Sequence, residues 1–196
     1  MSQSDYNELM LKAPLFFDET RHLLVPVRYE ASPHCDERPI GMAIDTVIIH
    51  GISLPPGQFG GEVICQFFCG QLDFNAYPSL DWLQKVRVSA HVLIKRNGEI
   101  IQFVPFNKRA WHAGQSNFDG RAQCNDFSIG IELEGTDFLP YEDIQYEQLA
   151  AIVRLLMTQY PHINHQRIVG HSDVAPGRKS DPGHYFNWDV FRGLIT

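Results

Sequence analysis

The stretch Phe127-Ser128-Ile129-Gly130-Ile131-Glu132-Leu133-Glu134 decides the fold of this 196-residue chain. Apolar side chains alternate in it with Ser, Gly and Glu, so a β-strand places the apolar side chains on one face and both carboxylates on the other. The apolar face needs a covering layer. Residues 141–160 supply one, because their Leu, Ile and Val side chains form a helical stripe between Pro140 and Pro161.

Further strands are predicted on the N-terminal side of this stretch. Residues 46–50 form an apolar run that ends in His50, typical of a strand buried on both faces, and a Pro/Gly-rich loop follows it. Residues 91–94 and 100–104 are apolar runs separated by Asn97-Gly98, which is the signal of a two-residue hairpin loop.

Short helices are expected over residues 62–69, after Ser79 and from Asn187 onward. Strands mixed with helices predict an α/β fold, a single domain with a central mixed β-sheet flanked by helices. Residues 1–24 are weakly patterned, and we assign them to an N-terminal extension. Residues 25–196 form the predicted domain.

Composition excludes several classes of partner. The chain is 44% hydrophobic and 20% charged, as in globular proteins, and its net charge is −7. Because nucleic acids and anionic membranes need a cationic surface, we expect neither as a partner. An acidic N-terminus, no apolar run of membrane-spanning length and four cysteines without a regular spacing predict a cytoplasmic protein.

The loop at residues 170–183 contains an imidazole, two carboxylates and two cations, and its Pro and Gly residues disfavour a helix. His171 from this loop, together with His50 at a strand end and one aspartate, supplies the donor set of a catalytic zinc site, which leaves one position open. Spacing alone does not choose between Asp173 and Asp181. A lone histidine at a strand end is more often a hydrogen-bonded core or rim residue than a metal ligand, so His50 supports a metal site only together with His171 and an aspartate.

Other polar residues have both a functional and an ordinary interpretation. Glu132 and Glu134 share one strand face, and either carboxylate beside a metal can act as a general base, whereas exposed strand carboxylates usually pair with a cation. Lys179 can stabilise an oxyanion, or it can form a solvated basic pair with Arg178. Residues 111–114 either line a pocket or close the edge of the core.

Five segments together resemble the AmpD-type N-acetylmuramoyl-L-alanine amidases. The resemblance covers the chain from about residue 25 onward, and its motifs occur in the family's order. The matching segments are residues 47–57, 87–91, 108–114, 124–135 and 170–183.

The resemblance implies a zinc enzyme of the bacterial cytosol with one Zn²⁺ per chain. Such an enzyme cleaves the amide between the lactyl group of 1,6-anhydro-N-acetylmuramic acid and L-alanine of the stem peptide, during cell-wall recycling. On matching positions, His50, His171 and Asp181 hold the zinc. Glu132 matches the catalytic carboxylate, and Lys179 matches the cation that stabilises the transition state.

The resemblance assigns further residues around these five. Asp173 braces the loop, and Arg87, Trp111 and His112 are expected to bind substrate. Gly51 departs from the family pattern, which has Asn after the first zinc ligand. We expect the anhydromuropeptide as the partner of a monomeric protein.

Two alternatives remain open on the sequence. The superfamily also resembles non-catalytic muropeptide-binding modules, which usually lack one of the metal ligands. A purely structural zinc would instead need a closed site with four ligands.

Overall fold

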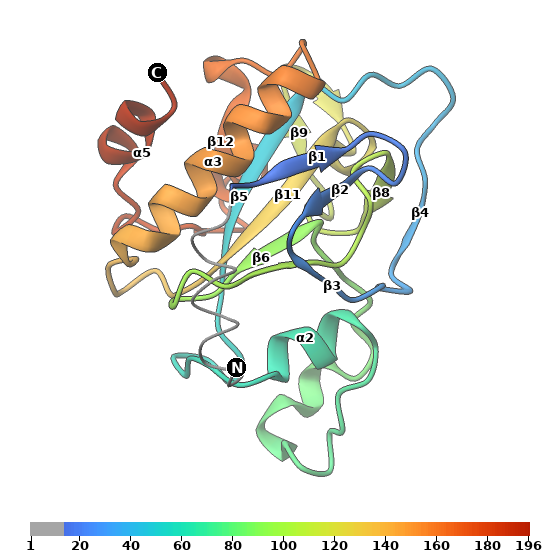
Figure 1. Ribbon diagram of the computed structural model, residues 1–196. Coiled ribbons are helices and arrows are strands. Elements are labelled where there is room, and N and C mark those ends of the chain that lie inside the picture. Colours follow the sequence, from blue (N-terminus) through green and yellow to red (C-terminus); the bar gives the residue numbers. More distant parts are fainter. Residues whose placement is uncertain (1–13) are drawn as a thin grey trace.

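The computed structural model describes residues 14–196 and is built around a six-stranded mixed sheet (Figure 1). The strands lie in the order β12-β5-β11-β6-β7-β3. The first four are parallel, β7 is antiparallel to β6, and β3 is parallel to β7. Their bounds are β3 Arg28–Tyr29, β5 Thr46–Ile52, β6 Val92–Ile94, β7 Ile100–Gln102, β11 Ser128–Glu134 and β12 Ile168–Gly170. The predicted mixed sheet is confirmed.

Helix α3, Asp143–Gln159, covers one face of the sheet, and α5, Trp188–Leu194, lies beside it (Figure 1). The apolar side chains within β11 pack against α3, as the alternation predicts. Phe127 precedes the strand and packs on the other face, with Ile48 and Cys124, so its predicted place on the apolar face was wrong. Gln145 is fully buried, and its side-chain amide donates to the carbonyls of Ile94 and Glu134. The first turn of α3 is therefore anchored to the ends of β6 and β11.

The other face of the sheet is covered by short segments. Helix α2, Val63–Phe68, and the 3₁₀ helix η1, Pro78–Leu83, cover one end, and α4, His171–Val174, with η2, Cys124–Asp126, covers the other. The helix expected after Ser79 is thus a 3₁₀ helix. The remaining elements are β1 Phe16–Asp18 with β2 Leu23–Val25, β4 Cys35–Glu37 with β8 Lys108–Ala110, β9 Asn117–Phe118 with β10 Arg121–Ala122, and η3 His165–Arg167.

The β6–β7 hairpin forms where Asn97-Gly98 predicted it, but its loop has three residues. The N–H of Gly98 donates to the carbonyl of Lys95, and the N–H of Lys95 donates to the carbonyl of Glu99, both at 2.9 Å. Gly98 has a φ of 84°. This is a turn followed by a left-handed glycine, so the prediction of a two-residue loop was wrong.

Residues 14–24, which we assigned to the extension, contain β1 and the start of β2. Leu23 and Leu24 are buried, and the ring of Phe17 stacks on Phe106 at 5.8 Å between centroids. The described part of the extension therefore packs on the domain. The boundary at residue 25 stays a prediction, and residues 1–13 lie outside the described part of the chain.

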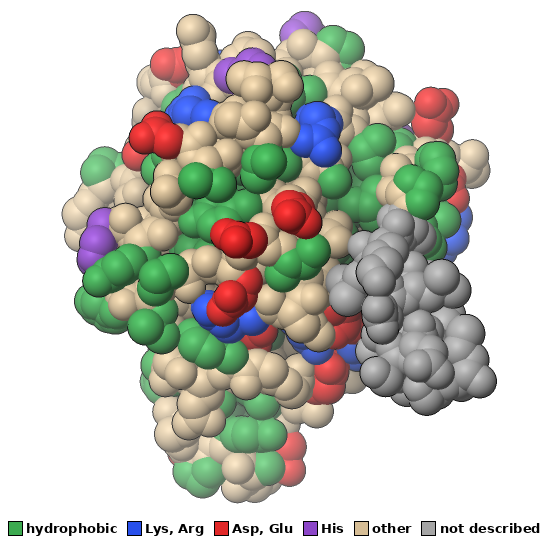
Figure 2. All heavy atoms as spheres, turned by 60° about the vertical axis from the view of Figure 1, so that its left-hand side comes forward, with side chains coloured by type: hydrophobic (Ala, Val, Ile, Leu, Met, Phe, Trp, Pro, Cys, Tyr) green, Lys and Arg blue, Asp and Glu red, His purple; other side chains and the backbone are tan. Residues whose placement is uncertain are grey.

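Figure 2 shows how charged side chains are distributed over one face of the molecule. On the face shown in Figure 2, Lys and Arg side chains are scattered, and acidic side chains lie among hydrophobic ones. No helix within residues 14–196 is long and apolar enough to cross a membrane.

Candidate metal centre

The parallel pairing of β5 with β11 brings His50 next to Glu132. These two residues are direct register partners, so their side chains lie on the same face of the sheet. Strand β12 pairs with the other edge of β5, and α4 begins with His171 immediately after it. The site thus forms at the carboxyl ends of parallel strands, where open α/β sheets bind ligands.

Three atoms from His50, His171 and Asp181 converge at this edge. Nδ1 of His50 lies 2.9 Å from Nδ1 of His171 and 3.2 Å from Oδ2 of Asp181. Nδ1 of His171 lies 3.0 Å from the same carboxylate oxygen. Two imidazole nitrogens and one carboxylate oxygen are the protein ligands of many catalytic zinc sites. The structure therefore groups Asp181, and not Asp173, with the two histidines.

The hydrogen bond at Nε2 of His171 shows whether the three converging atoms suit a cation. Nε2 of His171 lies 3.2 Å from the carbonyl oxygen of Ala113, which can only accept. A neutral His171 therefore has its proton on Nε2, and Nδ1 directs a lone pair towards Asp181. Two acceptors 3.0 Å apart repel each other unless a positive charge lies between them. The donor set fits a metal ion.

Electrostatics favours a neutral His50 and an ionised Asp181. Burial lowers the pKa of His50 to about 4, although contact with Asp181 opposes that shift. Burial alone raises the pKa of Asp181, but the rings of His171 and His50 outweigh it and hold the pKa below its ordinary value. A neutral imidazole and an ionised carboxylate are the forms that bind metals.

Glu132 lies beside the three ligands with part of its carboxyl group unbonded. Its Oε2 is buried and has no hydrogen-bond partner within residues 14–196. Burial raises the pKa of Glu132 well above its ordinary value, Asp181 adds to the rise, and Lys179 opposes it. A buried carboxyl group with a raised pKa and a free oxygen can exchange a proton with a bound molecule.

A cavity of about 620 Å³ contains these groups. Part of its lining comes from α2 and η1 and is apolar, with Phe67, Phe68 and Trp82. The polar part comes from β5, β11 and the loop at 179–181. Lys179 lines the cavity, and its side chain makes no hydrogen bond or ion pair with residues 14–196. The cavity thus combines an apolar wall with a carboxyl group and a cation near the candidate metal ligands.

Several contacts hold the loop that contains Asp181. Asp173 accepts a hydrogen bond from the N–H of Gly170 at 2.7 Å, so it braces the loop as the resemblance implies. The hydroxyl of Tyr141 donates to the carbonyl of Pro182 at 2.9 Å. A Cβ at Gly51 would lie 2.3 Å from this hydroxyl, so Gly51 leaves the space that Tyr141 occupies.

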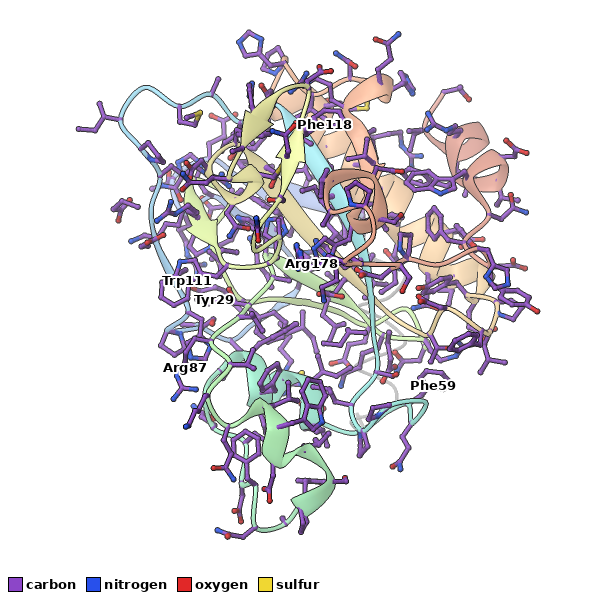
Figure 3. All side chains as sticks on the ribbon, turned by 180° about the vertical axis from the view of Figure 1, so that it is seen from behind. Tyr29, Phe59, Arg87, Trp111, Phe118 and Arg178 are labelled. Atoms are coloured by element: carbon purple, nitrogen blue, oxygen red, sulfur yellow. The ribbon has the colours of Figure 1, made fainter. Side chains whose placement is uncertain are left out.

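The three predicted substrate-binding residues lie in different surroundings. His112 borders the cavity but is buried behind His50. Arg87 and Trp111 lie along one edge in Figure 3 and are not part of the cavity lining. Arg87 donates to the carbonyls of Gln84 and Val86, and the indole N–H of Trp111 donates to Asp36.

Arg178, which lies nearer the middle of the face in Figure 3, has a supporting role that sequence reasoning missed. Its Nη2 donates to the carbonyls of Ala113 and Gln115, both at 2.6 Å. Asn125 was also missed, and its Oδ1 accepts from the N–H groups of His112 and Ala113. In the sequence, Asn125 is part of a polar run after Cys124, which indicates a loop. Its contact with residues 112–113 becomes visible only in the fold.

Comparison with known proteins agrees with this geometry. Residues 40–184 match the family described as N-acetylmuramoyl-L-alanine amidase. The chain is 54% identical over 173 residues to an Escherichia coli protein named 1,6-anhydro-N-acetylmuramyl-L-alanine amidase AmpD, covering 88% of this chain and 94% of that protein.

Solved structures give the same result. A crystal structure of a selenomethionine AmpD derivative superimposes with a TM-score of 0.88 at 52% identity, covering 92% of this chain and 99% of that one. The E. coli amidase AmiD, solved with anhydro-N-acetylmuramic acid-L-Ala-D-γ-Glu-L-Lys, superimposes with a TM-score of 0.57 at 28% identity, covering 92% and 65%. The chain therefore belongs to the N-acetylmuramoyl-L-alanine amidase family.

Proposed function

We propose that this chain is a zinc-dependent amidase that hydrolyses the bond between 1,6-anhydro-N-acetylmuramic acid and L-alanine of the stem peptide. One Zn²⁺ per chain binds to His50, His171 and Asp181. The observation that carries the proposal is the convergence of these three ligand atoms beside the unbonded oxygen of Glu132 in one cavity. The E. coli relative that is 54% identical to this chain is named a 1,6-anhydro-N-acetylmuramyl-L-alanine amidase, which supports the substrate class.

Glu132 transfers the protons of the reaction. As a general base it accepts a proton from the attacking water, and as the conjugate acid it donates that proton to the nitrogen of the leaving alanine. Its raised pKa suits the second step, because the carboxyl group then holds the proton until the amide bond breaks. The zinc ion, when bound, polarises the carbonyl group and lowers the pKa of water to about 7.

Lys179 stabilises the negative charge that develops on the lactyl carbonyl oxygen. Its ammonium group has no competing partner within residues 14–196, so it is available to the substrate. A single donor of this kind lowers the barrier by about 2.7–4 kcal/mol. Arg87 and Trp111 lie outside the cavity lining, and we propose that they contact parts of the substrate that extend beyond it.

The cellular setting is proposed on the same basis. Cys35, Cys65, Cys69 and Cys124 are all free thiols, as expected of a protein in a reducing compartment. We propose that the enzyme acts in the bacterial cytosol on soluble fragments of the cell wall. Soluble anhydromuropeptide should then be a better substrate than intact sacculi.

The proposal is tested by incubating purified protein with anhydromuropeptide or with sacculi, with and without chelator, and detecting free peptide by mass spectrometry. We expect peptide release from the soluble substrate, its loss with chelator and its return with Zn²⁺. Asp181→Ala should abolish zinc binding and hydrolysis together, whereas Asp189→Ala, at an exposed position on α5, should change neither. Binding without cleavage by the zinc-loaded protein would identify a muropeptide-binding module instead.

A further inference from the structure

His112, a third histidine, lies directly behind the candidate metal ligand His50. Its Nδ1 lies 2.9 Å from Nε2 of His50, and the two rings meet edge to face at 89°. We infer that His112 is a positioning residue, which fixes the orientation and the proton of His50 so that Nδ1 of His50 faces the metal. The inference rests on the metal site of the proposed function.

His50, His112 and Ser128 form a series of hydrogen bonds that ends at the carbonyl of Cys124. The direction of each bond follows from this last acceptor. Ser128 Oγ lies 2.6 Å from the carbonyl of Cys124, which only accepts, so the hydroxyl proton points there. Ser128 Oγ then accepts from Nε2 of His112 at 3.3 Å. Nδ1 of a neutral His112 consequently has a lone pair and accepts from Nε2–H of His50. Nδ1 of His50 is thereby left as the metal-binding atom.

The ring of His112 has little freedom to turn away from this position. A Cβ built on Gly130 would lie 2.4 Å from both Cγ and Nδ1 of His112, so the ring lies directly against the backbone of β11. Asn125 holds the backbone on the other side by accepting from the N–H of His112. Glycine at position 130 is therefore a requirement of the imidazole of His112.

The next residue, Ala113, orients the second histidine ligand. The carbonyl of Ala113 accepts from Nε2 of His171, and Arg178 donates to that carbonyl at 2.6 Å. His112 and Ala113 thus fix the proton position in both metal-binding imidazoles. Residues that orient metal ligands in this way typically contribute about 10- to 100-fold to metal affinity.

The tautomers provide a test that is independent of activity. In zinc-loaded protein labelled with ¹⁵N-histidine, two-bond ¹H–¹⁵N correlation spectra distinguish protonation at Nδ1 from protonation at Nε2. We expect the Nε2–H form for His50 and for His112. In Ser128→Ala, which keeps both rings, the Nε2–H preference of His112 should weaken. Protonation of His50 at Nδ1 in the wild-type protein would overturn the inference.

Metal affinity tests the consequence with a matched pair of variants. His112→Leu removes the acceptor of the hydrogen bond from His50. In His112→Asn the side chain is similar in length to Leu but can place an amide oxygen near the position of Nδ1. Competition with a chromophoric chelator should give a zinc dissociation constant about 10- to 100-fold higher for the Leu variant. We expect the Asn variant to lie within a few-fold of wild type.

The two proposals fail in different ways. If wild-type protein binds no zinc, the proposed function fails. If wild type binds zinc and the folded Leu variant binds it equally well, only the role of His112 fails. If the Leu variant does not fold, the role of His112 is judged from the protonated ring nitrogens in the spectra of wild type and Ser128→Ala.

Discussion

The candidate metal site has a back, formed by residues 112–113 behind the ligand histidines, and a front, which faces the cavity. The two sides differ in how many of their polar groups have hydrogen-bond partners. At the back, His112 is the hydrogen-bond partner of Nε2 of His50, and the carbonyl of Ala113 is the partner of Nε2 of His171. Ser128 in turn accepts from His112. At the front, Glu132 Oε2 and the ammonium group of Lys179 have no partner within residues 14–196. The fully bonded side positions the ligands, and the unbonded side is available for substrate.

The contrast has an energetic meaning. A buried polar group with its hydrogen bond contributes modestly to stability, whereas one without a partner costs about 1–3 kcal/mol. A folded protein therefore retains such a group only where other interactions offset the cost. The unbonded carboxyl oxygen of Glu132 thus marks the part of the site where function opposes stability.

Removing the front carboxylate should have the largest effect. Glu132→Gln keeps the size of the side chain but removes its ability to accept a proton, so we expect kcat to fall by about 10²- to 10⁴-fold. Zinc content, measured by atomic absorption, should stay at one per chain.

Glu134 is the matched control because it is two residues along the same face of β11. Its carboxylate accepts from the backbone N–H groups of Gly60 and Arg96, so it is already bonded. Glu134→Gln should leave kcat within a few-fold of wild type. An equal loss in both variants would remove the distinction between bonded and unbonded carboxylates.

The second effect concerns the free cation at the front. Lys179→Ala should lower kcat by about 10²- to 10³-fold, because one stabilising donor for the developing oxyanion is lost. Lys85→Ala, which removes an exposed lysine elsewhere, serves as the control. Steady-state kinetics should assign the loss to kcat, and a change confined to KM would assign Lys179 to ground-state binding instead.

The smallest effect is on stability and has a defined pH dependence. Because burial raises the folded-state pKa of Glu132 above its ordinary value of 4.5, the protonated carboxyl group stabilises the fold at low pH. This contribution is lost as the pH rises through the folded-state pKa. Metal-free Glu132→Gln should therefore be more stable than wild type at pH 8, by about 1–3 kcal/mol.

Urea denaturation of both proteins at pH 4 and pH 8 measures this difference. The extra free energy of unfolding of Glu132→Gln should decrease towards pH 4, where the carboxyl group of Glu132 is protonated in wild type. A gain of the same size at both pH values would attribute the effect to packing and not to ionisation.

Much of the fold was predictable because its strands have strong local patterns. The alternation in residues 127–134 and the apolar run before His50 predicted β11 and β5. The pairing between them was not predictable, because no local signal specifies which parallel strands are neighbours. Strand β12, with three residues, was too short to detect, yet it is the strand that places His171 beside His50.

The site was predictable to a similar degree. Chemistry alone suggested two histidines and an aspartate, but the choice of Asp181 over Asp173 came from resemblance and is now supported by distance. The family resemblance assigned His112 to substrate binding, whereas its position in a loop was compatible with either a pocket or the edge of the core. Its position behind His50 depends on Gly130 of a distant strand, and a sequence does not display that contact.

Anomalous diffraction from crystals of the zinc-loaded protein, recorded above and below the zinc edge, shows whether His50, His171 and Asp181 bind zinc and through which atoms. We expect one anomalous peak per chain, from a zinc ion bonded to Nδ1 of His50, Nδ1 of His171 and a carboxylate oxygen of Asp181. A peak bonded to Nε2 of His50, a zinc ion held by other residues, or no peak at full zinc loading would contradict the proposed metal site.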